Sequence, residues 1–186
     1  MKNLILHIEQ IKDKPLSQDF EENAEAFPVL ADMVQNHECE FLEPIKIHIK
    51  AFRVRELFEV EGAFQTRIRL TCSRCLNDFD TSFKSEFELT YTKELASITE
   101  SSDEEEIELR VEDIGLLYFR GEEINLRDAI QEQVVLAFPL RSLCAETCKG
   151  LCTQCGADLN QRDCGCMVAP GTNKFAALKD LKLDNQ

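Results

Sequence analysis

Cysteine is the residue type whose spacing in this chain of 186 residues points most directly to chemistry. Six of the nine cysteines fall between residues 143 and 167, at Cys144, Cys148, Cys152, Cys155, Cys164 and Cys166. The residues between them favour turns or solvent, so this segment has too little apolar material to form a core of its own. Thiolates two to four residues apart suit a tetrahedral metal ion, which holds sulfur ligands at about 2.3 Å. We therefore expect metal to hold the segment together.

An earlier pair, Cys72 and Cys75, leaves the distribution of ligands open. In one arrangement the cysteines form two four-thiolate sites, which are Cys72, Cys75, Cys144 and Cys148, and Cys152, Cys155, Cys164 and Cys166. In the other, four of the six late cysteines hold one ion, and the early pair is a separate dithiol or has no role. We favour the first because it leaves no thiolate unused, although its Cys-x-Cys spacing is unusually tight. A chain without bound metal is the third alternative.

Zinc with a structural role is the metal that we expect, as one ion or two. A catalytic zinc normally includes His or carboxylate ligands and keeps one position open for water. Here His7, His37 and His48 all lie far in sequence from the late cysteine cluster. A redox Cys-x2-Cys pair would need a strand that leads into a helix, whereas Cys72 and Cys75 join two predicted strands. We therefore expect no enzyme activity and no small-molecule substrate.

Residue alternation predicts a sheet in the middle of the chain. Apolar side chains recur at every second position over residues 45–51, 58–70 and 79–91, which is typical of antiparallel strands with one solvated face. Gly62 suggests a bulge in the second strand. Helical spacing predicts helices over residues 17–27, from Asn125 or Asp128 to residue 137, and over 172–181. A short strand is expected at residues 4–8, and an acidic loop at residues 97–110. Residues 107–111, at the end of this loop, have the alternation of an edge strand. Residues 29–40 fit no element.

Charge is distributed unevenly in a chain whose net charge is −14. The alternation places Lys46, Lys50, Arg67 and Arg69 on the solvated face, and Arg74 lies between the early cysteines. These five bases form a candidate RNA-binding patch; the alternative is that their long side chains simply cover the sheet. The first ten residues do not resemble a signal peptide, and no stretch approaches the roughly 20 apolar residues that span a membrane. We expect a cytoplasmic protein with reduced thiols and no membrane partner.

Three motifs together resemble the YceD family, the large ribosomal RNA subunit accumulation proteins. They are LTCSRCL at residues 70–76, LAFPL at 136–140, and CKGLCTQCGADLN at 148–160 with CGC at 164–166. Thr153 stands where the family often has Pro, and Asp158 where it often has Asn, and neither change removes a cysteine. The first forty residues resemble no family. The resemblance implies a bacterial cytosolic factor that acts in ribosome assembly.

Together these observations predict an α+β protein, with an antiparallel β-sheet, flanking helices and a C-terminal cysteine-rich zinc-binding segment. Residues 1–140 would form the sheet domain, and residues 141–186 a zinc-binding tail packed on it. The expected function is accumulation or processing of large-subunit (23S) rRNA, through binding of that rRNA or a pre-ribosomal particle. The alternative function is a zinc-stabilised adaptor that docks a ribosomal protein or a nuclease.

Overall fold

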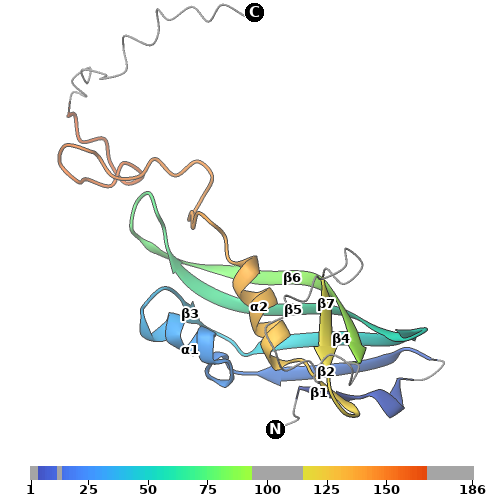
Figure 1. Ribbon diagram of the computed structural model, residues 1–186. Coiled ribbons are helices and arrows are strands. Elements are labelled where there is room, and N and C mark those ends of the chain that lie inside the picture. The colour runs from blue at the N-terminus through green and yellow to red at the C-terminus, as the bar shows by residue number, and fades with distance from the viewer. Residues whose placement is uncertain (1–3, 12–13, 94–114, 167–186) are drawn as a thin grey trace, which may run out of the picture.

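A computed structural model describes residues 4–11, 14–93 and 115–166 of the chain. Its larger sheet has strands in the order β2-β4-β5-β6-β7 (Figure 1). The short strand β3 also pairs with β5, at residues further along β5 than those that pair with β4. These strands are β2 (Leu16–Glu22), β3 (Glu40–Phe41), β4 (Ile45–Val54), β5 (Leu57–Thr71), β6 (Asp78–Lys93) and β7 (Leu116–Phe119). All neighbours are antiparallel except β6 and β7, which pair in parallel. The α+β fold is confirmed, with a mixed rather than purely antiparallel sheet.

The buried face of the sheet follows from the alternation. Ile45, Ile47, Ile49 and Ala51 of β4 are at most 2% exposed, and the polar residues between them face solvent. The register sets Ile47 opposite Phe64 and Ala51 opposite Val60, so apolar rows cross from strand to strand. Such cross-strand apolar pairs stabilise a sheet and fix its register.

Both helices cover this apolar face (Figure 1). They are α1 (Pro28–Gln35), which follows a short 3₁₀ turn at Ala24–Ala26, and α2 (Arg127–Ala137). A second 3₁₀ turn, Ile8–Gln10, lies earlier in the chain, before β2. Leu30 of α1 and Ile130 and Val134 of α2 are fully buried in the core. The ring of Phe138, just past α2, lies 4.6 Å from that of Phe83 on β6. In this way α2 carries the chain to the end of the β5–β6 hairpin.

Two of the remaining strands form a small separate sheet. β1 (Ile5–His7) pairs antiparallel with β8 (Glu123–Asn125), and this pairing brings the start of the described chain beside the start of α2. The predicted strand at 4–8 and the predicted helix that ends at 137 are both confirmed. Neither α1 nor α2, the α-helices of the described residues, has the length and apolar character to cross a membrane. The expected acidic loop at 97–110, the strand at 107–111 and the helix at 172–181 lie outside the described residues.

Two local expectations were wrong. Residues 16–22 form β2 rather than a helix, because their backbone pairs with β4 and every second side chain, including that of buried Glu22, faces the core. Pro28, the residue after the expected helix, begins α1, since proline suits the first helical position. Gly62 forms no bulge: it pairs evenly with Ile49 and with Phe87. The glycine is required for packing, because a Cβ there would lie 2.2 Å from the Phe87 ring.

Candidate metal centres

The structure brings eight cysteines together in two sets of four. The junction cluster consists of Cys72, Cys75, Cys144 and Cys148, and the distal cluster of Cys152, Cys155, Cys164 and Cys166. Within each cluster all sulfur atoms lie within 4.8 Å of one another. These are the two sets of the arrangement favoured from the sequence, and either set could hold a metal ion.

The sulfur spacing in the junction cluster fits a tetrahedral ion. Cys72 Sγ lies 3.9 Å from Cys148 Sγ, and Cys75 Sγ lies 3.7 Å from Cys144 Sγ. Four sulfurs at about 2.3 Å around one ion would be about 3.8 Å apart. A disulfide would instead hold two sulfurs at about 2 Å, and all nine cysteines are free. The donor set therefore fits a thiophilic ion.

The two Cys-x2-Cys turns stabilise their first thiolate in the same way. The backbone N–H of Cys75, with that of Cys144, lowers the pKa of Cys72 to about 6. The backbone N–H groups of Cys155 and Gln154 likewise lower the pKa of Cys152 to about 6. Because the thiolate is the form that binds metal, each turn presents a sulfur that is prepared for coordination.

The clusters differ in their surroundings. In the junction cluster Cys72, Cys75 and Cys148 are at most 6% exposed, and Phe79, Leu143 and Leu151 pack against them. In the distal cluster Cys155 is exposed, and Cys164 and Cys166 are half-buried. The junction cluster joins two distant parts of the chain, whereas the distal cluster closes only a local loop.

Hydrogen bonds to backbone carbonyls hold the described cysteine arm (residues 141–166) on the β5–β6 turn (Figure 1). The N–H and hydroxyl of Ser73 both donate to the carbonyl of Ser142, at 2.8 and 3.0 Å. The Arg74 guanidinium donates to the carbonyls of Glu146 and Cys148, at 3.1 and 2.9 Å. Arg74 is thus a structural residue of the junction, and contact of this residue with RNA stays a prediction.

Asp158 links the distal loop to the same turn. Its carboxylate accepts hydrogen bonds from Asn77 Nδ2 at 2.8 Å and from Asn160, whose side chain also donates to Cys148 Sγ at 3.4 Å. The backbone N–H of Asn160, together with these side-chain donors, lowers the pKa of Asp158. Leu151 and Asp158 form a β-bridge that flanks the Cys152–Cys155 turn.

Asp158→Ala should loosen the arm without removing metal, because Asp158 orients Asn160 and is not a ligand. We expect amide exchange at Lys149 and Asn160 to rise several-fold, since one lost hydrogen bond costs about 1 kcal/mol, while elemental analysis gives unchanged metal content. Asp163→Ala is the control, because Asp163 accepts only a local bond from Gly165. Equal exchange in the two variants would contradict this role.

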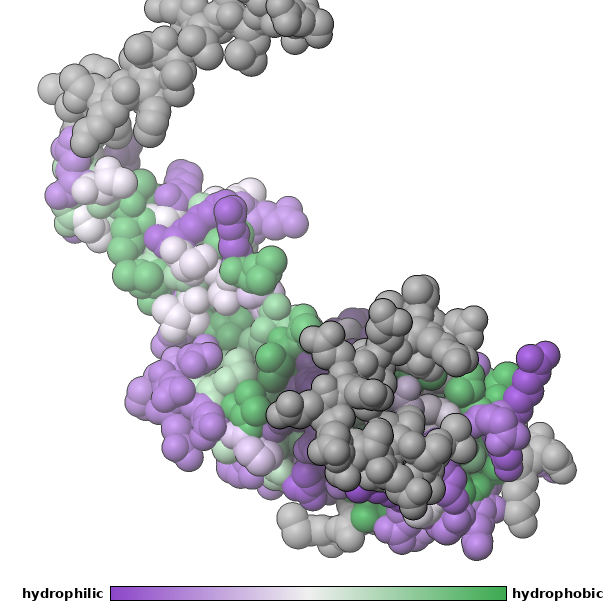
Figure 2. Space-filling model, in the orientation of Figure 1, coloured by the Kyte–Doolittle hydropathy of each residue, from purple (hydrophilic) through white to green (hydrophobic). Residues whose placement is uncertain are grey.

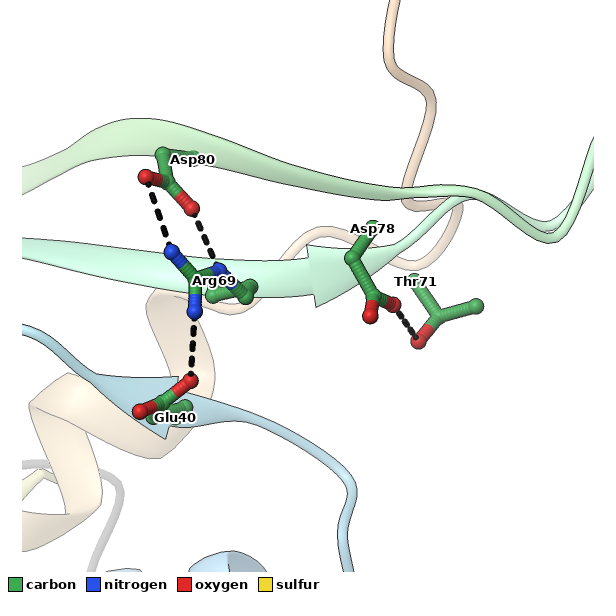
Figure 3. A network of polar contacts seen from close by, with 5 residues as sticks. All are labelled: Glu40, Arg69, Thr71, Asp78 and Asp80. Carbon is green, nitrogen blue, oxygen red and sulfur yellow. Dashed lines mark hydrogen bonds and ion pairs between the residues drawn. The ribbon is translucent and has the colours of Figure 1, made fainter.

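The polar face of the sheet carries acids and bases in pairs, so it is not the basic patch expected. Lys50 pairs with Glu61 at 3.5 Å, and Arg67 with Glu43 at 3.6 Å. Arg69 donates to both oxygens of Asp80, at 2.7 and 3.2 Å, and to Glu40 at 3.1 Å (Figure 3). Lys46 lies between Glu21 and Gln65 in the register. Contact of these bases with RNA stays a prediction; in this structure Lys50, Arg67 and Arg69 have carboxylate partners.

Arg69→Gln should raise the pKa of Asp80 towards its ordinary value of 3.8. The hydrogen bond from Arg69 is the main cause of its lowered pKa, and Arg67 acts only through its charge. A carboxyl whose pKa is lowered by folding stabilises the fold at pH values above its pKa in the unfolded state. This stabilisation is lost as the pH falls through the pKa of the folded state. An NMR titration of the Asp80 carboxyl carbon measures the shift. Arg67→Gln should shift it less, and an unchanged value in Arg69→Gln would contradict the pairing.

The same face carries a Ser-His-Asp row that was not predicted from the sequence. His48 Nδ1 donates to Asp19 Oδ1 at 2.7 Å, and Ser17 Oγ lies 3.5 Å from His48 Nε2. The order resembles a nucleophile, a base and an orienting acid, but the side chains of His48 and Asp19 are 55% and 83% exposed. Water therefore competes for every bond of the row. Beside it lies an open trough of about 930 Å³ with Ala63 among its lining residues.

Comparison with known proteins identifies the family. The family model described as large ribosomal RNA subunit accumulation protein YceD matches residues 60–182, a range that includes both clusters. The chain belongs to the YceD family. Within this family it is similar to "Large ribosomal RNA subunit accumulation protein YCED homolog 1, chloroplastic" from Arabidopsis thaliana, with 30% identity over 66% of this chain and 44% of that protein.

A relative of the same name from Zea mays is 25% identical over 63% of this chain and 46% of its own length. The chain thus spans less than half the length of the curated YceD relatives that it matches. No solved structure matches the chain.

Proposed function

We propose that this chain is a ribosome assembly factor needed for large-subunit rRNA to accumulate, and that it acts by binding rather than by catalysis. Membership of the YceD family carries the proposal, since the family description and both relatives' names refer to accumulation of this RNA. Nine free cysteines favour work in a reducing compartment such as the cytoplasm.

Two structural zinc ions are the second part of the proposal. A tetrahedral set of four thiolates is typical of zinc or of iron and iron–sulfur centres, and zinc supplies a redox-inert, rigid crosslink. Four sulfurs fill the coordination of the ion and leave no position for water, which supports a structural role. At the junction cluster, Cys72 and Cys75 would fix the sheet, and Cys144 and Cys148 the arm, to one ion.

Association with a pre-ribosomal particle is favoured over binding of free RNA. Phosphates would have to displace the carboxylates that pair with Arg67 and Arg69, and the net charge of −14 opposes approach to RNA. The second candidate is a zinc-stabilised adaptor that contacts only a protein of the particle, or a nuclease. The ion pairs of Arg67 and Arg69 with carboxylates favour this candidate too, because they leave these side chains less available for phosphates.

Co-sedimentation with purified large-subunit precursor particles tests the proposal. We expect the zinc-loaded chain to sediment with large-subunit and not small-subunit precursors, and its absence from the particle fractions would contradict the proposal. Arg67→Glu with Arg69→Glu separates the two candidates. Loss of association, together with steep weakening of wild-type binding by salt, indicates phosphate contacts. Wild-type sedimentation of this variant at low and high salt indicates the adaptor.

A further inference from the structure

Open space surrounds the backbone of the distal cluster. A Cβ built on Gly156 or on Gly165, each beside a cysteine of the cluster, would meet no atom within 4 Å beyond the neighbouring residues. At the junction, a Cβ on Gly150 would instead lie 3.0 Å from the carbonyl oxygen of Arg74. Small molecules from solvent therefore reach the distal loop more easily than the junction.

The cysteines of the two clusters differ in the same way. Cys155 is exposed and the other three distal cysteines are half-buried, whereas three of the four junction cysteines are at most 6% exposed. Between Cys152 and Cys166 the apolar residues other than cysteine are Ala157 and Leu159. The distal loop thus has little apolar material with which to cover its sulfurs, and in Figure 2 the arm beyond the junction is a narrow projection with a largely polar surface.

The exposed thiol of Cys155 has a second cysteine within reach. Cys152 and Cys155 lie in one turn, closed by a hydrogen bond of 2.9 Å from the Gly156 N–H to the Cys152 carbonyl, and their sulfurs are within 4.8 Å of each other. A disulfide holds two sulfurs at about 2 Å, so a shift of less than about 3 Å joins them. Cysteines that respond to oxidants are solvent-accessible and have such a partner nearby.

We propose that the distal cluster is an oxidation site, at which hydrogen peroxide converts Cys152 and Cys155 into a disulfide and so releases the distal ion; this rests on the two ions proposed above. The Cys155 thiolate attacks one peroxide oxygen, which breaks the O–O bond and gives a sulfenic acid and hydroxide. The Cys152 thiolate then displaces hydroxide from the Cys155 sulfur. The two thiolates lose one electron each, and the peroxide takes both and leaves as two hydroxides. Only Cys164 and Cys166 then remain to hold the ion.

The junction cluster should resist the same oxidant. Cys144 is its exposed member, but the sulfur of Cys75, 3.7 Å away, belongs to a residue that is 3% exposed. A disulfide between them would pull the arm against the β5–β6 turn, where Leu143 and Leu151 pack on the buried cysteines. Peroxide should therefore free the end of the arm and leave its attachment to the sheet intact.

Addition of hydrogen peroxide to the zinc-loaded chain, with a chromogenic chelator that reports free zinc, tests this site. We expect one ion per chain to leave at least about ten times faster than the second, because oxidation follows the exposure of the thiolate. The tryptic peptide of residues 150–162, whose cysteines are Cys152 and Cys155, should then contain the disulfide. Amide exchange should rise at Gly156 and stay unchanged at Ser73.

Two double variants assign the fast and the slow ion. Cys72→Ser with Cys75→Ser should release its remaining ion at the fast rate, and Cys152→Ser with Cys155→Ser at the slow rate. Equal rates in these variants, or a disulfide that includes Cys144 instead of the one within residues 150–162, would overturn the inference alone. Fewer than two zinc ions before oxidation would contradict the proposed zinc centres, and the inference would fail with them.

Discussion

Replacing both Cys72 and Cys75 by serine should lower the metal content from two ions per chain to one and release the cysteine arm from the sheet. The pair supplies half of the junction cluster, and a divalent ion is held poorly by the two thiolates that remain. Structural zinc in small domains contributes about 10–16 kcal/mol of apparent binding free energy, so this is the largest effect that we expect. Amide exchange at Ser73 and Leu151, whose N–H groups bond across the junction, should approach that of open chain.

Two matched variants make this result specific. Cys39→Ser should keep both ions, because Cys39 lies apart from both clusters and its buried thiol has a pKa raised to about 11, chiefly by burial. Cys152→Ser with Cys155→Ser should also lose one ion but keep the exchange protection of Ser73. Two ions retained in the Cys72 and Cys75 double variant would contradict the junction cluster as a metal centre.

Gly62→Val should destabilise the sheet by about 3 kcal/mol or more. A Cβ at this position would lie 2.2 to 2.9 Å from three atoms of the Phe87 ring, which is 7% exposed and packed in the core. Overpacking in a core typically costs about 1–3 kcal/mol of stability, and displacement of a buried phenylalanine ring adds to that cost. Urea unfolding of the metal-loaded chain, followed by fluorescence of its two tyrosines, measures the change.

Ala63→Val is the control for this substitution. Ala63 is the next residue on β5, half-buried on the polar face beside the open trough of about 930 Å³, where a β-branched side chain has room. The distal cluster should bind its ion in both variants, because its four cysteines lie within one short loop. Equal unfolding midpoints for the two valine variants would show that Phe87 does not constrain Gly62.

The long strands and the two cysteine sets could be predicted because their signals are local. Alternation over 45–51, 58–70 and 79–91 matches β4, β5 and β6, and the cysteine spacing leaves few ways to form sets of four. Strand β2 was not predicted because the polar residues Gln18 and Glu22 stand at core-facing positions, so apolar and polar residues do not alternate along it. The apolar residues Leu16 and Phe20 then have helical spacing.

The charge of the polar face could not be predicted without the strand register. Alternation shows that Arg69 points to solvent, but its partners Asp80 and Glu40 come from β6 and β3. The Ser17, Asp19 and His48 row likewise requires β2 to be placed beside β4.

The large-subunit to small-subunit rRNA ratio, measured in cells depleted of this chain, tests the proposed function most directly. We expect the ratio to fall on depletion and to recover with the wild-type chain. The Cys72→Ser, Cys75→Ser variant should not restore it, because its arm is no longer held on the sheet. An rRNA ratio that stays unchanged when the chain is absent would contradict a role in large-subunit rRNA accumulation.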